Sequence, residues 1–71
     1  MDKERLSFAV CLINEAAQVW GILPSQVYKR LNSVGYFERY LIPHYDVLHT
    51  QGMRYLIDDA EEYLVRREQR A

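Results

Sequence analysis

His44, Asp46 and His49 are the side chains of this sequence whose types suit a transition-metal site or acid–base chemistry. A helix would place Asp46 and His49 on one face, whereas His44 would have to fold back from the corner at Pro43. The sequence has no third histidine to complete a ligand set. A simpler interpretation has Asp46 capping a short helix and His49 near its end, where the helix dipole favours an imidazole. We therefore predict no metal and no cofactor.

Nucleophilic catalysis also lacks its residues in this sequence. Ser7, Ser25 and Ser33 have no base close to them in sequence, and no glycine-rich loop is present to hold a phosphate. No pair of carboxylates marks an evident cleft. The sequence therefore predicts a protein that is not an enzyme.

Residues 16–31, AAQVWGILPSQVYKRL, have the spacing of a helix-turn-helix. Ala17 would lie where the two helices touch, Gly21 would supply the positive φ of the turn, and Val27 would dock the second helix. The residues that this helix would present to base edges and phosphates are Gln26, Lys29, Arg30 and Asn32. However, Arg30 stands where an apolar side chain is expected, and the chain has a net charge of −1 rather than a basic face. We therefore favour a helix-turn-helix that serves only to pack its two helices together. Nucleic-acid binding stays open as the alternative.

Six tyrosines are many for the interior of so small a protein, and tyrosine is a residue that protein interfaces favour. Several of them gather around the Pro43 corner. We expect a protein-interaction surface there, formed by Tyr36, Tyr40, Tyr45 and His49.

The composition indicates one small folded domain over residues 1–71. With 49% hydrophobic residues the chain has enough apolar area to fold, although a chain of this size is marginal, which leaves a homodimer open. Cys11, the one cysteine, lies in the apolar run AVCLI. We predict that its side chain is buried in the core and that the protein resides in a reducing compartment. Neither a leader sequence nor a membrane-length apolar run is evident, so we expect a cytoplasmic protein with no membrane contact.

The apolar spacing predicts an all-α fold, a compact bundle of four to five short helices. Residues 6–34 form the helix-turn-helix-like pair: a first helix to residue 20 that buries Leu6, Val10 and Leu12 among others, a stop at Gly21, and a second helix from Pro24 to Gly35. Residues 36–42 and 45–51 predict two further short helices, the latter closed by Gly52 in the left-handed conformation.

Residues 53–57 are ambiguous. Apolar residues at 53, 56, 57, 60 and 64 fit one continuous helix. Alternatively, Asp58 and Glu61 form the capping box of a helix that starts only there, after a short extended segment at 53–57. We favour the extended segment. Glu62 and Arg66 are then an i,i+4 ion pair in the last helix.

The pattern LSFAVCLINEAA, the Pro-Ser-x-x-Val-Tyr helix and the block YDVLHTQGMRYLIDD resemble a family of short bacterial domains of unknown function. The most specific part is a Tyr-Asp-x-Leu-His-Thr-x-Gly block, which begins at Tyr45 and ends at Gly52. Genes of this family often lie beside one for an ADP-ribosyltransferase-like domain, so the resemblance implies a toxin–antitoxin or modulator pair. Our hypothesis from sequence is a non-enzymatic protein-interaction domain, an antitoxin-like partner of a neighbouring gene product. The alternative is a helix-turn-helix regulator that reads nucleic acid through residues 25–34.

Overall fold

The first element of the chain is the helix α1 (Lys3–Trp20), in a computed structural model that describes residues 2–69. The helix starts where it does because the Asp2 carboxylate accepts the backbone N–H of Arg5 at 2.9 Å. It ends at Gly21, which has a φ of 68° and donates its N–H to the carbonyl of Ala17 at 2.9 Å. The predicted stop at Gly21 is confirmed.

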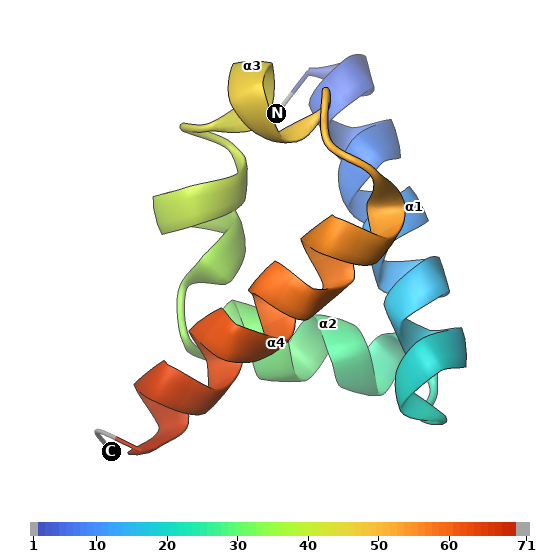
Figure 1. The fold of residues 1–71 in the computed structure, drawn as a ribbon, viewed down its shortest axis with the longest axis vertical. Coiled ribbons are helices and arrows are strands. Elements are labelled where there is room, and N and C mark those ends of the chain that lie inside the picture. The colour runs from blue at the N-terminus through green and yellow to red at the C-terminus, as the bar shows by residue number, and fades with distance from the viewer. Residues whose placement is uncertain (1, 70–71) are drawn as a thin grey trace.

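The second helix, α2 (Pro24–Ser33), leaves α1 at an angle of 109° (Figure 1). Pro24 occupies its first turn, and the N–H of Leu23 donates to the Gln26 side-chain carbonyl at 2.9 Å. This angle and the three-residue connection are those of a helix-turn-helix pair. The predicted pair is confirmed as a structural unit.

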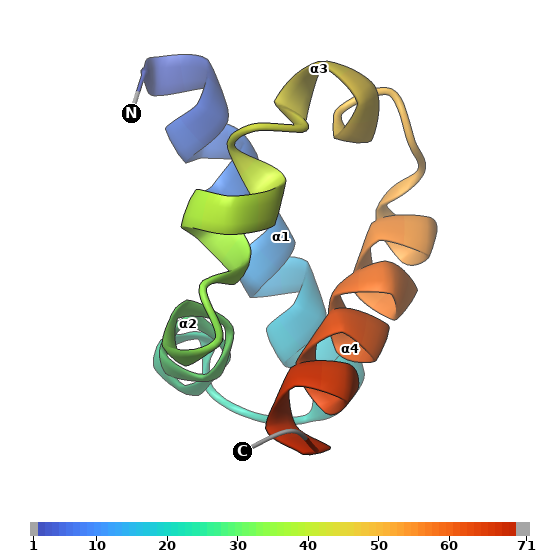
Figure 2. The ribbon, with the colours of Figure 1, turned by 90° about the vertical axis from the view of Figure 1, so that its left-hand side faces the viewer.

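Three further elements complete the fold: the π-helical turn η1 (Phe37–Leu41), the short helix α3 (Tyr45–Leu48) and the long helix α4 (Met53–Gln69). Helix α4 packs on α1 and α2, while η1 lies across the molecule from α1 and α3 lies at the end where α1 begins (Figures 1 and 2). Residues 2–69 contain helices and no strand, so the predicted all-α bundle of short helices is confirmed. Within these residues no single helix is long and apolar enough to span a membrane. Of the described helices, only the bent pair α1–α2 reaches that length and apolarity, when its two helices are counted together.

Apolar side chains from all five elements meet in one core. Leu12 and Ala16 of α1 and Leu56 and Ala60 of α4 are fully buried. The other buried residues are Ala9, Ala17, Val27, Leu31, Tyr36, Phe37, Leu41, Leu48, Ile57 and Leu64.

The extended segment expected at residues 53–57 is wrong, because α4 is helical from Met53 onward. Leu56 is 0% exposed and Ile57 is 2% exposed. Adjacent residues of a strand point to opposite faces, so an extended segment would have exposed one of them. A helix brings both to the core together with Ala60 and Leu64, and this burial prevails over a capping box at Asp58.

The predicted core face of α1 is rotated from the observed one. Leu6 and Val10 are 52% and 47% exposed, and Val19 is also exposed, whereas Leu12 is fully buried. Helix α2 leaves α1 at a steep angle and so cannot cover its whole length (Figure 1). Cys11 is exposed rather than buried, because it is turned 100° around the helix from Leu12.

Gly52 does not have the left-handed conformation expected for it, since the positive-φ glycines of the described chain are Gly21 and Gly35. Its carbonyl instead accepts the N–H of Leu56 at 3.1 Å and so begins α4. Helix α3 ends at Leu48, earlier than expected, and Thr50 donates its hydroxyl to the carbonyl of Val47 at 2.7 Å in the turn that follows.

The continuous α4 yields a prediction for stability. Leu56→Ala should lower the free energy of unfolding by about 2–5 kcal/mol, because it leaves a cavity in the core. Val65→Ala, at a position 44% exposed on the same helix, should change it by no more than about 0.5 kcal/mol. Urea denaturation followed by circular dichroism measures both. Equal effects of the two substitutions would contradict the observed register of α4.

Candidate functional site

Three tyrosine rings fill the space between η1 and α4, which lie beside each other (Figure 2). The ring centroids of Tyr36 and Tyr63 are 5.3 Å apart, and those of Tyr36 and Tyr40 are 5.4 Å apart. Tyr40 and Tyr63 also contact each other at 5.3 Å. Edge-to-face and tilted contacts of this kind stabilise aromatic clusters beyond the area they bury. The cluster therefore fixes η1 against α4.

Tyr40 links this cluster to a carboxylate. Its hydroxyl donates a hydrogen bond of 2.5 Å to Oδ2 of Asp59 on α4. This bond raises the pKa of Tyr40 to about 12, with smaller contributions from desolvation and from the charge of Asp59, because each favours the neutral phenol. The hydrogen bond also fixes the orientation of the Asp59 carboxylate.

The ring of Tyr36 packs against that of Tyr40, and Tyr36 is fully buried. Its hydroxyl finds no hydrogen-bond partner among the described residues. Burial raises the pKa of Tyr36, and the nearby Asp59, Tyr40 and Tyr63 raise it further. A buried hydroxyl without a partner costs free energy, so this group makes the core less stable than a phenyl ring in its place would.

Helix α4 presents further groups beside Tyr40. Tyr55, Asp59 and Glu62 are spaced i, i+4 and i+7 and so form one stripe along the helix. Tyr55 is 57% exposed, and Glu62 is an exposed residue that pairs with Arg66. We call Tyr40, Tyr55, Asp59 and Glu62 together the tyrosine–carboxylate face. It combines two phenols and two carboxylates on the surface where η1 meets α4.

The predicted surface at the Pro43 corner is only partly assembled. Tyr45 and His49 stack with their rings 4.7 Å apart, and Tyr45 also contacts Phe8 of α1. These contacts dock α3 on α1. Tyr40 belongs to the η1–α4 cluster instead, and the buried Tyr36 is not available to a partner, which corrects its placement on a contact surface.

The histidines and Asp46 do not form a ligand set. The ring of His44 lies against Tyr40, and Nδ1 of His49 lies 2.8 Å from the Tyr45 carbonyl. Asp46 lies 3.9 Å from the Arg5 guanidinium and does not cap α3, so that role for it is wrong. Among residues 2–69 no three His, Cys, Asp or Glu side chains are grouped so that they could hold a metal ion.

The residues expected to read nucleic acid divide into two groups. Gln26 accepts the N–H of Leu23, and Arg30 forms an ion pair with Glu68 of α4 at 3.1 Å. Lys29 and Asn32 are exposed on α2. Two of the four expected side chains are thus already bonded to other residues of the domain.

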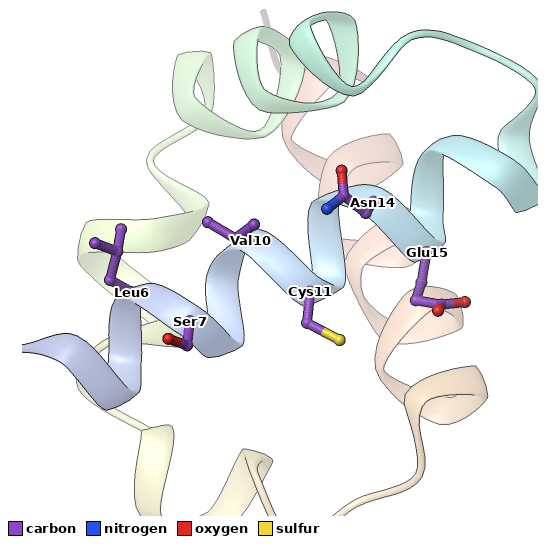
Figure 3. Close-up of a pocket in the computed structure, with 6 residues that line it drawn as sticks. All are labelled: Leu6, Ser7, Val10, Cys11, Asn14 and Glu15. Atoms are coloured by element: carbon purple, nitrogen blue, oxygen red, sulfur yellow. The ribbon is translucent and has the colours of Figure 1, made fainter.

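Two hollows lie away from the tyrosine–carboxylate face. One runs along the outer side of α1 and is lined by residues of that helix alone (Figure 3): Leu6, Ser7, Val10, Cys11, Asn14 and Glu15. The other lies where α1, α2 and α4 meet, lined by Val19, Trp20, Arg30, Glu61, Leu64 and Val65. The first is an open stretch of surface rather than a cleft, because a single helix lines it. Arg30, which lines the second, is the residue that pairs with Glu68.

Sequence reasoning did not select Tyr55, Asp59 or Glu62 as site residues. Their i, i+4, i+7 spacing was visible, but it has meaning only on a continuous helix. The extended segment expected at 53–57 separated Tyr55 from the two carboxylates. The contact between Tyr40 and Asp59 joins residues 19 positions apart and has no local signal.

The fold and the site define a small all-α domain with an aromatic, partly acidic surface. Residues 7–67 match the model of a family described as "Protein of unknown function (DUF3791)". The chain belongs to this family. No curated protein is significantly similar to it. No solved structure is either.

Tyr36 and Tyr40 of the cluster should respond differently to loss of their hydroxyls. Tyr36→Phe removes a buried group that lacks a partner and should leave the free energy of unfolding unchanged or raise it by up to about 1 kcal/mol. Tyr40→Phe removes the hydrogen bond to Asp59 and should lower it by about 1 kcal/mol. Urea denaturation of both variants checks the difference. A larger loss for Tyr36→Phe than for Tyr40→Phe would contradict the observed hydrogen bonding.

The raised pKa values predict sensitivity to alkali. An unfolded tyrosine ionises near a pKa of ~10, whereas Tyr40 in the fold does so at about 12 and Tyr36 is shifted in the same direction. Between these values the unfolded chain binds fewer protons than the folded one, so stability is complete below about pH 10 and falls as the pH rises toward about 12. Urea midpoints measured across that range should decline, and less steeply in Tyr40→Phe. An identical decline in this variant would refute the assignment.

Proposed function

We propose that this chain is a non-enzymatic protein-interaction domain that binds its partner through the tyrosine–carboxylate face. The observation that carries the proposal is Tyr55, which is 57% exposed on α4 and has no ring contact among the described residues. A large aromatic side chain in that position contributes little to the core. It is available to bury against another protein.

The surroundings of Tyr55 support this use. Tyrosine is enriched among the residues that dominate binding energy, because its ring is apolar and rigid and its hydroxyl is polar. Tyr40 and Asp59 are already oriented by their mutual hydrogen bond, so less conformational entropy is lost when a partner binds them. The face is therefore preorganised on two packed elements.

The family resemblance suggests which kind of protein the partner is. The Tyr-Asp-x-Leu-His-Thr-x-Gly block at residues 45–52 resembles that of short bacterial domains encoded beside an ADP-ribosyltransferase-like domain. An antitoxin-like partner of such a gene product is the role that we propose on this ground. In this chain the block itself has structural tasks: Leu48 is buried, Tyr45 docks α3 on α1, and Thr50 closes the turn. The contact surface therefore lies beside the block rather than in it.

Tyr55→Ala tests the proposal. The variant should stay folded, because alanine favours the helix and little buried area is lost, and it should weaken partner binding by about 2 kcal/mol or more. Tyr28→Ala is the control for loss of an exposed tyrosine elsewhere on the surface, since Tyr28 is 49% exposed on α2, where its ring stacks on Phe37. Tagged wild-type and variant proteins are compared by affinity capture from native lysate with nuclease present. Equal recovery of the partner by all three proteins would exclude this face.

Nucleic-acid binding through α2 is a second candidate, favoured by the 109° angle between α1 and α2. The ion pair between Arg30 and Glu68 and the use of Gln26 in the helix start count against it. If α2 binds DNA, changing Lys29 and Arg30 to alanine should abolish binding, and the affinity of the unmodified protein should fall steeply with salt. Electrophoretic mobility shift at several salt concentrations measures both. Absent or salt-insensitive binding would remove this candidate.

A further inference from the structure

The two carboxylates of the tyrosine–carboxylate face lie on the same side of α4. Asp59 and Glu62 share the stripe that begins at Tyr55, and Glu61 lies on the opposite flank, where it lines the hollow beside α1. Both Asp59 and Glu62 are close enough to the Tyr40 phenol to contribute to its raised pKa. Negative charge is thus concentrated next to two tyrosine rings.

The cation that already neutralises part of this charge is held loosely. Arg66 pairs with Glu62, but the side chains of the two residues are 75% and 58% exposed. An exposed pair of this kind contributes little to stability, so a cation from outside can replace Arg66 at small cost. Glu62 is therefore accessible to a charged group of a partner.

Tyrosine rings of this chain already bind guanidinium groups. Arg67 lies over the ring of Tyr63 at 4.9 Å from its centroid, next to the tyrosine–carboxylate face. Arg5 lies over Tyr45 at 4.7 Å. A planar guanidinium attracts the face of an aromatic ring and binds a carboxylate with two parallel hydrogen bonds. Tyr55, with a neighbouring carboxylate and an exposed ring, offers the same combination to a partner.

The Tyr36 hydroxyl lies beneath the face but is closed off from a partner. The hydroxyl of Tyr36, which is 0% exposed, lies near Asp59 and Tyr40 and is unpartnered among residues 2–69. The rings of Tyr40 and Tyr63 cover it on the side of α4. The oxygens that a partner can reach are therefore those of Asp59, Glu62 and Tyr55. A guanidinium has five N–H donors and no acceptor, so it suits these carboxylate and phenol oxygens.

We propose that the tyrosine–carboxylate face receives an arginine side chain of the partner protein, stacked on Tyr55 and paired with Asp59 and Glu62. This inference rests on the proposed function and specifies the chemistry of the partner. Arginine is preferred over lysine, because a compact ammonium cannot stack as a plane or form the two-bonded pair.

Peptide titration tests the proposal on the intact chain. The probes are a short glycine–arginine peptide, the same peptide with lysine in place of arginine, and the same peptide with glutamate. Backbone amide shifts of α4 are followed by NMR at low salt. We expect the arginine peptide to perturb residues 55–62, the lysine peptide to bind more weakly, and the glutamate peptide not to bind.

Two variants with the same change of net charge show whether binding depends on the tyrosine–carboxylate face or on the charge of the whole chain. Glu62→Gln should weaken binding of the arginine peptide about three- to five-fold. Glu61→Gln removes the same charge from the other flank and should leave that affinity within the error of the titration. Equal loss in both variants, equal affinity for the lysine peptide, or no shift of residues 55–62 would each overturn the proposal.

The outcome separates this inference from the proposed function. If the arginine peptide fails while Tyr55→Ala still loses a captured partner, the interaction domain stands and its partner contributes something other than arginine. If Tyr55→Ala loses nothing while the peptide binds as expected, the face binds guanidinium but is not the surface that captures the partner.

Discussion

The left-handed backbone at Gly21 is the constraint on which the other contacts of this domain depend. A residue with a side chain would pay about 1–2 kcal/mol for this conformation, although a Cβ at Gly21 would meet nothing within 4 Å. The turn sets α2 at 109° to α1. Two helices at this angle cannot cover each other along their length, so both need a third element. Helix α4 supplies it, and Tyr40 of η1 and the preceding Tyr36 in turn pack against α4.

The features that could be predicted from sequence are those with local causes. Gly21 and Pro24 mark where α1 ends and α2 begins, and the observed helices end and begin there. Two local signals conflicted at residues 53–57: a capping box at Asp58 and a helical apolar stripe. The stripe prevailed because Leu56 and Ile57 both reach the core. Burying two large aliphatic side chains is worth several kcal/mol, about 1.5–3 kcal/mol each, whereas a cap is worth about 1 kcal/mol.

The candidate site was less accessible to prediction, because it depends on which elements meet. Tyr40 was selected for its residue type, but its partner Asp59 lies on another helix. Tyr36 was selected for the same reason and is fully buried. Residue type alone does not distinguish a tyrosine that fills the core from one that faces a partner. That distinction requires the angle at which α4 crosses the bundle, which no single segment of the sequence specifies.

The tyrosine–carboxylate face is divided between η1 and α4, and this division couples recognition to folding. Tyr40 comes from one element, and Tyr55, Asp59 and Glu62 come from the other. The complete face exists only while α4 is docked, so anything that binds across it also holds the two elements together. Occupancy at one hundred times the dissociation constant would add about 2.7 kcal/mol to the free energy of unfolding. For a domain of this size that is a substantial share of the total, so any ligand bound across the face would also protect the chain from unfolding.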